Sequence, residues 1–342
     1  MSQSQALRLP IIVLTAPFRW LFDLITAFVK EIPRIPGELW KNRFLYMLGL
    51  PGVIWLIVFA YVPMSGHIIA FKNYRAPKGV FGSDWLPADD FFRNFEFFFD
   101  SGQWIEVTFN TLFLNFLFIV SEMFIALVIA VFLNEVRIMI FRRVSQSLVL
   151  LPFFISWLAV SVMFFALFNA TDGLVNNLLI AIGGEDAAVG WYSTPQAWPG
   201  LLTGLHVWKT AGYSSIIFLA AITGIPEELY ESAKIDGANK RQQIFYITLP
   251  LLKPTVIILL LLALGRVFYG NFEMIYSLVG ENGLLFSTTN IIDTYTYRAL
   301  RNLGNFGMTA AVGFYQAIMG LVAILFFNWL VKRIDPDERG LF

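Results

Sequence analysis

The sequence predicts an all-α fold, that of a polytopic membrane protein, and three observations lead to this fold class. Of the 342 residues, 57% are hydrophobic and only 14% are charged, which is far more apolar than an ordinary soluble domain. Apolar segments long enough to cross a bilayer recur along the chain. The polar connection at residues 226–250 separates two of them and carries helix-start and turn signals. We therefore expect a bundle of core transmembrane helices in one membrane domain.

Six segments have the length and composition of transmembrane helices. They are Phe44 to Met64, Val107 to Leu133, Leu148 to Phe168, Trp198 to Ile222, Thr255 to Val279 and Met308 to Val331. An even number of spans places both termini on one side of the membrane. The predicted organisation is an N-terminal extension over residues 1–43, a transmembrane domain over residues 44–331 and a short tail over residues 332–342.

The N-terminal extension contains a further apolar stretch at residues 10–30. Arg19, Asp23, Thr26 and Lys30 recur there on one stripe of a helix. This pattern favours an amphipathic helix that lies in the membrane interface. A seventh span is the alternative, but it would bury Arg19 and Asp23 at a cost of a few kcal/mol each unless they were paired.

The polar connection at residues 226–250 has the signals of a helix-turn-helix. Pro226 suits the first turn of a helix, and the two glutamates that follow complement the positive N-terminus of that helix. Asp236-Gly237 supplies a turn that ends one helix and allows the next to begin. We interpret the segment as a helix pair on the membrane surface.

Small residues and a carboxylate stand together in the first of these helices. Ser232 and Ala233 would let the helix bring its backbone close to a partner, while Glu231 offers an acceptor for a bidentate arginine. Gly237 permits the positive backbone angle that a tight reversal needs. A solvated amphipathic helix without a partner is the alternative.

This segment resembles the EAA loop, the ATPase-docking element of permease subunits in binding-protein-dependent ABC importers. The matching positions are Glu231, Ser232, Ala233, Gly237, Ile247, Leu249 and Pro250. Ser232 departs from the family, which usually has Ala there, by a hydroxyl with little change in size. The resemblance implies that Glu231, Ser232, Ala233, Asp236 and Gly237 couple the chain to an ATPase.

The distribution of basic residues predicts the orientation of the chain. One side of the predicted topology holds Arg8, Arg19, Lys30, Arg34, Lys41, Arg43, Arg137, Arg142, Arg143, Lys234, Lys240, Arg241, Lys253, Lys332, Arg333 and Arg339. The opposite side holds fewer, namely Lys72, Arg75, Lys78, Arg93, Arg298 and Arg301. By the positive-inside rule, both termini and the EAA-like loop are cytoplasmic, on the side where ATP is available.

Further patches are similar to the carbohydrate-uptake class of these permeases, in particular the branch associated with complex oligosaccharides such as uronate-containing polymers. They are Tyr61 to Met64, Ile69 to Tyr74, Leu133 to Val136, Leu151 to Trp157, Phe272-Glu273 and Ile292 to Arg298. The resemblance runs from about Phe44 to the C-terminus. Phe153 stands where a polar residue, often His, is expected, and the long N-terminal extension is not typical, so the sugar stays open.

The resemblance also implies the partners and the location of the chain. The sequence has no Gly-x4-Gly-Lys-Ser/Thr motif, so we expect no cofactor in this chain and ATP with Mg²⁺ on a partner ATPase. The implied assembly has a second, similar permease, two ATPase subunits and an extracytoplasmic solute-binding protein, in the bacterial inner membrane. The expected function is thus that of a non-catalytic subunit of an oligosaccharide importer.

Two other classes of function fit the sequence less well. An ion-gradient-driven secondary transporter would also use charges inside the membrane, but it has no use for a cytoplasmic ATPase-docking helix pair. A membrane-embedded enzyme lacks support. The chain has no Cys, which rules out thiolate catalysis, and its two histidines, His67 and His206, are too far apart in sequence to form a metal-binding motif. No basic patch with interleaved aromatics suggests a nucleic-acid partner.

Charged and aromatic residues inside the spans give the candidate substrate path, since such charges are costly in a bilayer and usually face a cavity. The candidates are Trp208, Lys209, Tyr213, Arg266, Tyr269, Asn271 and Glu273. Aromatic faces stack on sugar rings, and Asn, Glu and Lys hydrogen-bond hydroxyl groups. For an acidic cargo, Lys209 and Arg266 would be the counter-charges.

The residues of the fifth predicted span that belong to this path share one helix face. Arg266, Tyr269 and Glu273 follow each other at spacings of three and four residues, and Tyr276 or Ser277 continues the same face, as expected if the span is one continuous helix. The alternative is structural: Lys209 and Arg266 would pair with Glu273 or Glu122 to hold helices together.

Overall fold

The structure is a computed structural model that describes residue 37 and residues 40–334. The chain divides into two compact units, residues 1–66 and residues 67–342, and each is considered by itself. The predicted interfacial helix at residues 10–30 and the last residues of the predicted tail lie outside the described residues.

The first unit is a single helical run. It contains α4 (Arg43–Leu56), a π-helical turn (Ile57–Tyr61) and α5 (Val62–Met64). None of the side chains of α4 is buried within the unit, although nearly all of them are apolar. An apolar helix without a packed face is expected where lipid or a partner surrounds it, so the run fits the first predicted span.

The second unit opens with a small folded connection. Its elements are β1 (Lys72–Asn73), α6 (Gly79–Gly82), β2 (Asp84–Trp85), α7 (Arg93–Asp100) and most of a 3₁₀ helix (Ser65–Phe71) that begins two residues before the boundary. The strands pair antiparallel, with Lys72 opposite Trp85. The ammonium group of Lys72 is buried and donates to the carbonyls of Val80 and Phe81, both at 3.0 Å, which holds α6 against the ribbon.

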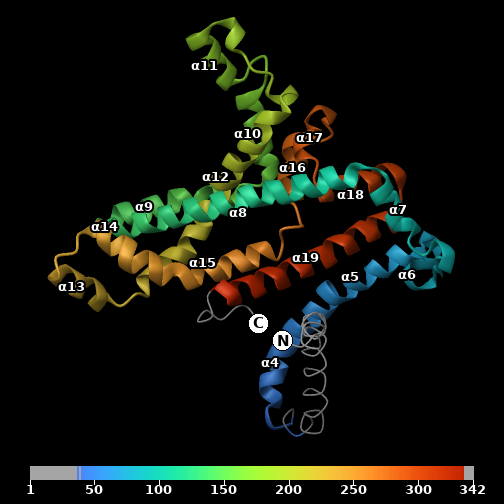
Figure 1. The fold of residues 1–342 in the computed structure, drawn as a ribbon, viewed down its shortest axis with the longest axis horizontal. Coiled ribbons are helices and arrows are strands. Elements are labelled where there is room, and N and C mark those ends of the chain that lie inside the picture. Colours follow the sequence, from blue (N-terminus) through green and yellow to red (C-terminus); the bar gives the residue numbers. More distant parts are fainter. Residues whose placement is uncertain (1–36, 38–39, 335–342) are drawn as a thin grey trace, which may run out of the picture. The chain divides into compact units, whose positions relative to one another are not determined.

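Two long helices, α8 and α12, form the centre of the second unit (Figure 1). Their bounds are α8 (Gln103–Glu135) and α12 (Trp198–Thr223). The two helices pack along much of their length. They cover the second and fourth predicted spans, which the structure confirms as helices.

The third predicted span is bent, which corrects the expectation of one straight helix over residues 148–168. It consists of α9 (Met139–Leu150), a 3₁₀ turn (Leu151–Phe154) and α10 (Trp157–Phe168), with a 96° bend between the two helical parts. Pro152 lies in the turn, where its missing N–H ends the helical hydrogen bonding. The Ser156 side chain then caps α10 by accepting from the N–H of Ala159 at 3.2 Å.

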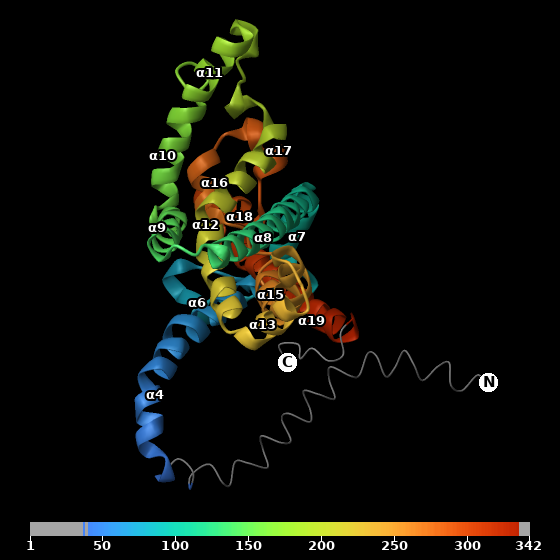
Figure 2. The same cartoon turned by 90° about the vertical axis from the view of Figure 1, so that its left-hand side faces the viewer.

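Beyond the bend, α10 and α11 (Leu174–Gly183) project away from α8 (Figure 2). α9 instead lies close to α12, because Gly212 brings the two backbones together. A Cβ at Gly212 would meet the carbonyl oxygen of Val149 at 2.0 Å. A larger residue therefore does not fit there without a backbone shift.

The fifth predicted span is also interrupted, and the continuous helix expected over residues 255–279 is wrong. α15 (Leu249–Leu264) ends in tight turns, and α16 (Phe272–Val279) begins after an irregular break at residues 265–271. The Asn271 side chain caps α16 by accepting from the N–H of Met274 at 3.1 Å. Arg266 and Tyr269 consequently lie in the break, so a helical spacing does not relate them to Glu273.

The chain ends with α17 (Phe286–Thr289), α18 (Ile292–Leu303) and the long α19 (Phe306–Ile334). Four helical runs of the described chain are long and apolar enough to cross a membrane, or five if α9 and α10 count as one bent span. These runs are Arg43–Phe71, Gln103–Glu135, Lys240–Leu264 and Phe306–Arg333. At 26 residues α12 has the length of a span but is less apolar, because it carries the polar residues described below.

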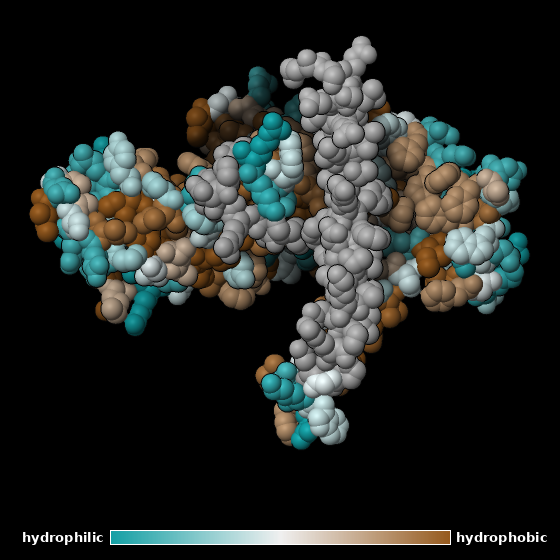
Figure 3. All heavy atoms as spheres, turned by 60° about the horizontal axis from the view of Figure 1, so that its bottom comes forward, coloured by the Kyte–Doolittle hydropathy of each residue, from teal (hydrophilic) through white to brown (hydrophobic). Residues whose placement is uncertain are grey.

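Buried apolar side chains of the second unit form three clusters. One joins α8, α10, α12 and α16; a second joins α7, α8, α18 and α19; the third joins α8, α12 and α15. α8 contributes to all three and is therefore the common support. In Figure 3, apolar residues cover much of what is visible of the unit, and hydrophilic residues are seen at both its left and its right end.

Candidate functional site

The polar connection at residues 226–250 forms the predicted helix-turn-helix. It consists of α13 (Glu227–Ile235), a short turn, and α14 (Lys240–Gln243), which continues through a π-helical turn (Ile244–Thr248) into α15. Pro226 is the residue that precedes the first helical turn of α13. The hydroxyl groups of Tyr230 and Thr248 lie 3.0 Å apart, so α13 is tied to the start of α15.

Gly237 closes α13 with the positive backbone angle that the sequence predicted. Its φ is +84°, its N–H donates to the Lys234 carbonyl at 3.1 Å, and the Ala238 N–H donates to the Ala233 carbonyl at 2.8 Å. These two bonds make a Schellman motif, in which a glycine in the left-handed region satisfies the last carbonyls of a helix. The glycine and the small residue four positions earlier therefore belong to one device that ends α13.

α14 is fixed at its start by a capping box. The Asn239 side chain accepts from the Gln242 N–H at 3.0 Å, and the Gln242 side chain accepts from the Asn239 N–H at 2.8 Å. Gln243 is buried, and its amide nitrogen donates to the Ala238 carbonyl at 3.2 Å. Because both ends of the turn are fixed in this way, the two helices hold a defined angle.

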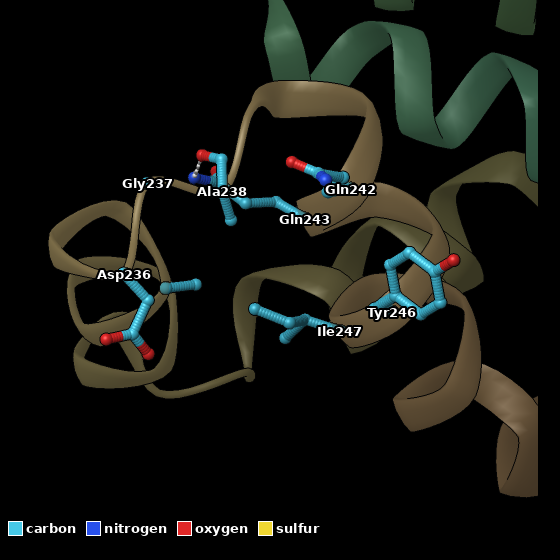
Figure 4. A pocket seen from close by; sticks show the side chains of 8 residues that line it. Asp236, Gly237, Ala238, Gln242, Gln243, Tyr246 and Ile247 are labelled. Carbon is cyan, nitrogen blue, oxygen red and sulfur yellow. Dashed lines mark hydrogen bonds between the residues drawn. The ribbon is translucent and has the colours of Figure 1, made fainter.

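A pocket of about 250 Å³ lies between the two helices (Figure 4). Its lining residues are Ala233, Asp236, Gly237, Ala238, Gln242, Gln243, Tyr246 and Ile247. Three of the five predicted coupling residues, Ala233, Asp236 and Gly237, therefore meet at one pocket. Ser232 instead donates to the Glu228 carbonyl at 2.8 Å, and the Glu231 side chain is exposed.

An ion pair connects this helix pair to the central helix of the unit. The Lys240 ammonium lies 3.0 Å from the Glu135 carboxylate, which is the last residue of α8. In the sequence, Lys240 is one of the basic residues that set the orientation, and Glu135 lies in a family-like patch without a role of its own. No spacing rule connects two residues this far apart in sequence, so the pair could be found only in three dimensions.

Lys209, a predicted path residue, directs its charge at the bend of the third span. It is 7% exposed, and its ammonium donates to the carbonyls of Phe153 at 2.7 Å, Ile155 at 2.5 Å and Pro152 at 3.4 Å. A lysine has three N–H donors, and these three carbonyls take them. The predicted hydrogen bonds from Lys209 to sugar hydroxyls therefore have no donor left in this structure.

The structural alternative for the same charges is also corrected. Within the described residues, neither Lys209 nor Arg266 forms an ion pair with Glu273 or Glu122. Glu122 instead accepts from Ser214 at 2.5 Å and pairs with His206, whose Nε2 lies 2.8 Å from its carboxylate. Glu122 thus forms a structural contact between α8 and α12, through partners that the sequence did not suggest.

The break between α15 and α16 is held by side chains from three other helices. Asn115 of α8 donates to the carbonyls of Val267 at 2.7 Å and Tyr269 at 3.0 Å, and Gln316 of α19 donates to that of Phe268 at 3.0 Å. The Asp293 carboxylate of α18 accepts from the Gly270 N–H at 2.7 Å. These contacts satisfy the backbone groups that the break frees from helical bonding, as a chain at membrane depth requires.

Gly270 is needed at this break for space. A Cβ there would lie 2.3 Å from the Ile291 side chain and 3.0 Å from the Asp293 carboxylate. Asn115 and Gln316 are polar residues within long apolar helices. This is the same sequence signal that identified Lys209, so both residues could have been predicted from it. Asp293 lay inside a family-like patch, but nothing in the sequence gave it a partner.

The remaining predicted path residues are largely exposed on the second unit. Trp208, Tyr213, Arg266, Tyr269 and Glu273 are exposed, and Asn271 is partly buried. The Tyr213 ring stacks on the Phe153 ring, with centroids 4.4 Å apart. Tyr213 therefore packs against the bend that Lys209 holds in place. These side chains come from α12, from the break and from α16.

Comparison with known proteins agrees with this architecture. Residues 122–338, more than half of the chain, match the family of binding-protein-dependent transport system inner membrane components. The polygalacturonan/rhamnogalacturonan transport system permease protein YteP of Bacillus subtilis (strain 168) is 35% identical over 94% of this chain and 97% of its own length. Protein LplB of the same organism is 33% identical over 88% of this chain and 92% of its own length.

Solved structures of ABC transporters are also similar to this chain. A chain of a bacterial ABC transporter involved in the import of the acidic polysaccharide alginate is 33% identical, with a TM-score of 0.77 over 88% of this chain and 99% of the solved chain. In the complex of such a transporter with a periplasmic protein bound to an alginate pentasaccharide, the TM-score is 0.78 at 33% identity, over 90% of this chain and all of the solved chain. This chain is a member of the family of binding-protein-dependent transport system inner membrane components.

Proposed function

We propose that this chain is one of two membrane subunits of an ATP-driven importer that takes up an acidic oligosaccharide from an extracytoplasmic binding protein. The observation that carries the proposal is the rigid helix pair α13 and α14, which leaves Glu231 exposed and lies inside the family-matched segment. An ion-gradient-driven transporter would not need such a helix pair, and the family membership argues against it.

The names of the relatives support the class of cargo. One relative is named for polygalacturonan and rhamnogalacturonan, and the solved transporter imports alginate, which its description calls an acidic polysaccharide. All these polymers contain uronate sugars. A uronate-containing oligosaccharide is therefore the cargo we propose for this chain.

ATP and Mg²⁺ bind, in this proposal, to two separate ATPase subunits on the cytoplasmic side. The ATPase subunits dock on α13, where the Glu231 carboxylate accepts hydrogen bonds from an arginine of the ATPase. Ala233, Asp236 and Gly237 line the pocket, which receives a side chain of the ATPase. Closure of the ATPase pair moves this helix pair, and the Lys240 to Glu135 ion pair and the Tyr230 to Thr248 contact pass the movement to α8 and α15. Both chain termini are on the same cytoplasmic side.

The substrate path of the proposal uses the exposed residues of α12, the break and α16. Trp208, Tyr213 and Tyr269 offer aromatic faces, while Arg266, Asn271 and Glu273 offer hydrogen bonds. Arg266 is the counter-charge for a uronate. Lys209 has a positioning role, because it holds the bend on which Phe153 and Tyr213 stack.

The proposal is tested with the complex reconstituted from this chain, its second permease, the ATPase and the binding protein. Glu231→Ala should lower the ATP hydrolysis that loaded binding protein stimulates about tenfold, because a buried charge-assisted pair is lost. Glu106→Ala removes another exposed carboxylate, near the start of α8, and should leave hydrolysis unchanged. Uptake that persists without the ATPase, driven by an ion gradient alone, would exclude the proposed function.

A further inference from the structure

Three aromatic rings form a continuous platform between α16 and α18. The Phe272 and Tyr276 rings stack with centroids 5.2 Å apart, and the Tyr297 ring contacts them at 5.0 Å and 4.9 Å. Each of the three residues is partly exposed. The two helices that carry the platform, α16 and α18, lie away from α13 and α14 in the second unit (Figures 1 and 2).

Charged groups surround this platform. The Arg301 guanidinium donates to the Tyr276 hydroxyl at 2.9 Å and lies 3.6 Å from the Glu281 carboxylate. Both charged residues are exposed, as is Glu273 on the neighbouring turn. Two charged side chains, Arg301 and Glu281, lie against the Tyr276 hydroxyl and make this surface unfavourable for lipid tails. The rings therefore face either a polar path or another protein.

The chemistry of the surface favours a sugar. An aromatic face presents a flat apolar surface to the C–H groups of a pyranose ring, while the charged rim hydrogen-bonds the hydroxyl groups. Arg301 has five N–H donors and is held in place by two partners, so its remaining donors can form a bidentate pair with a carboxylate. A uronate residue offers both a ring face and a carboxylate.

The platform also continues the proposed path. Phe272 and Tyr276 belong to α16, which directly follows the break that carries Arg266 and Tyr269. Glu273 lies between them in sequence and belongs to the path already. In the sequence, Phe272 and Tyr297 stand out only as parts of family-like patches.

We propose that Phe272, Tyr276 and Tyr297, together with Arg301, form a binding subsite for one uronate residue at the outer end of the path. The sugar ring stacks on the aromatic platform, and its carboxylate pairs with Arg301. The subsite rests on the proposed function, because it assumes that an acidic oligosaccharide passes through this chain.

The test uses the full reconstituted complex and a radiolabelled probe, alginate pentasaccharide or pentagalacturonate, whichever the unmodified complex transports. Tyr297→Leu removes the ring but keeps apolar bulk, and it should lower sugar uptake per ATP hydrolysed about fivefold. Tyr297→Phe keeps the ring and should stay within about twofold of the unmodified complex. Phe124→Leu removes an aromatic ring that is 64% exposed on α8, outside the subsite, and should change nothing.

The role of the charge is tested in the same assay. Arg301→Gln should reduce uptake about tenfold and Arg301→Lys less, because a lysine keeps the charge without the bidentate geometry. The concentration of loaded binding protein that gives half-maximal ATP hydrolysis should stay unchanged in all these variants. A raised half-maximal concentration would identify the platform as a surface for the binding protein and overturn the subsite.

Copurification of the second permease and the ATPase separates a binding role from an assembly role. The Tyr297→Leu complex could lose the second permease or the ATPase while the Tyr297→Phe complex keeps both and transports normally. In that case, sugar uptake by the Tyr297→Trp complex distinguishes a binding role from an assembly role. A wider ring should keep the subsite working, and loss of uptake in an intact Tyr297→Trp complex would overturn it. If the unmodified complex transports neither acidic probe, the cargo class fails and the subsite fails with it; if it transports one and the ring variants behave normally, only the subsite fails.

Discussion

Lys209 illustrates at the scale of single residues how a charge is accommodated inside an apolar helix. Its ammonium donates to three backbone carbonyls at the bend between α9 and α10, and the Pro152 carbonyl also accepts from the Ile155 N–H at 3.1 Å. The Phe153 and Trp157 rings lie 5.5 and 5.4 Å from the same ammonium and add cation–π attraction. The charge is therefore a structural component of the bend.

Lys209→Met should accordingly destabilise the protein. The loss of the ammonium removes a donor from the partly buried carbonyls of Phe153 and Ile155, and we expect the free energy of unfolding to fall by about 3 kcal/mol. Thermal unfolding of the purified complex in detergent measures this change. Removing Glu273 as well should restore nothing, since no ion pair connects the two residues; a rescue by Glu273→Gln would contradict the role assigned to Lys209.

Arg266→Met provides the matched control for that experiment. Arg266 is exposed and has no ion pair within the described chain, so its removal should change the free energy of unfolding by less than about 0.5 kcal/mol. If Arg266 is the counter-charge of the path, the same variant should still lose uptake of an acidic sugar. The Lys209→Met variant therefore tests a role in stability, and the Arg266→Met variant tests a role in transport.

Gly237→Ala should weaken coupling through the backbone alone. Nothing lies within 4 Å of a Cβ at this position, but a φ of +84° is strained for any residue with a Cβ and costs about 1 kcal/mol. We expect lower ATP hydrolysis stimulated by loaded binding protein, with partial recovery in Gly237→Asn, because asparagine tolerates the left-handed region. Gly200→Ala, where φ is not positive and the space is equally open, should behave like the unmodified chain. Equal effects of the two alanines would refute the argument.

Some residue roles followed from the sequence, while others did not. The positive angle of Gly237 was predictable because a glycine after an Asp at a helix end has a known local use. The partners of Lys209, Glu122 and Asp293 were not, because each bond joins residues far apart in sequence. A charged residue inside a transmembrane span predicts that a polar partner exists, but the sequence does not identify that partner.

Among the secondary-structure elements, the connection between α8 and the α13–α14 pair is the most informative contact. The Lys240 and Glu135 side chains that form it are 55% and 34% exposed, so the pair contributes little to stability. Its position at the end of α8 matters more than its energy. An exposed ion pair of this kind is suited to transmit a direction of movement and to break and reform.

Lys240→Glu should therefore uncouple transport from hydrolysis more than it destabilises the chain. We expect the free energy of unfolding to change by less than about 1 kcal/mol while uptake per ATP hydrolysed falls. The reversed pair, Lys240→Glu with Glu135→Lys, should recover part of the uptake, and a double-mutant cycle measures the coupling energy. Failure of the reversed pair to recover any uptake would show that the contact has no part in coupling.

Local signals predicted the elements themselves with uneven success. Long apolar runs gave α8 and α19 closely, because hydropathy alone defines such helices. The same runs hid the breaks after Leu150 and Leu264, since an apolar residue looks alike in a helix and in a buried turn. Pro152 was the visible sign of the first break, and Gly265 with Gly270 the sign of the second.

For the whole molecule, the orientation in the membrane is the property to test. This chain has no Cys, so single cysteines can be introduced without background. Asn239→Cys, on the exposed turn of the helix pair, should be shielded from an impermeant thiol reagent in intact cells. Asp89→Cys, exposed on the connection between the first two spans, should react, whereas Ser83 is 4% exposed and therefore unsuitable as a probe. Labelling of position 239 from outside would reverse the orientation and remove the ATPase-docking assignment.

α8 is the element on which a mechanical property of the molecule rests. Its 33 residues make a rod about 50 Å long. One end carries the ion pair to Lys240, and near the other end Asn110 donates to the carbonyls of Ser287 and Asn290 while Thr111 accepts from the N–H of Ile292. A stiff rod of this length acts as a lever: a tilt of about 5° at one end displaces the other by about 4 Å. Such a displacement is close to the thickness of a sugar ring, so a small motion at one end would be enough to open or close a passage for one residue of an oligosaccharide at the other.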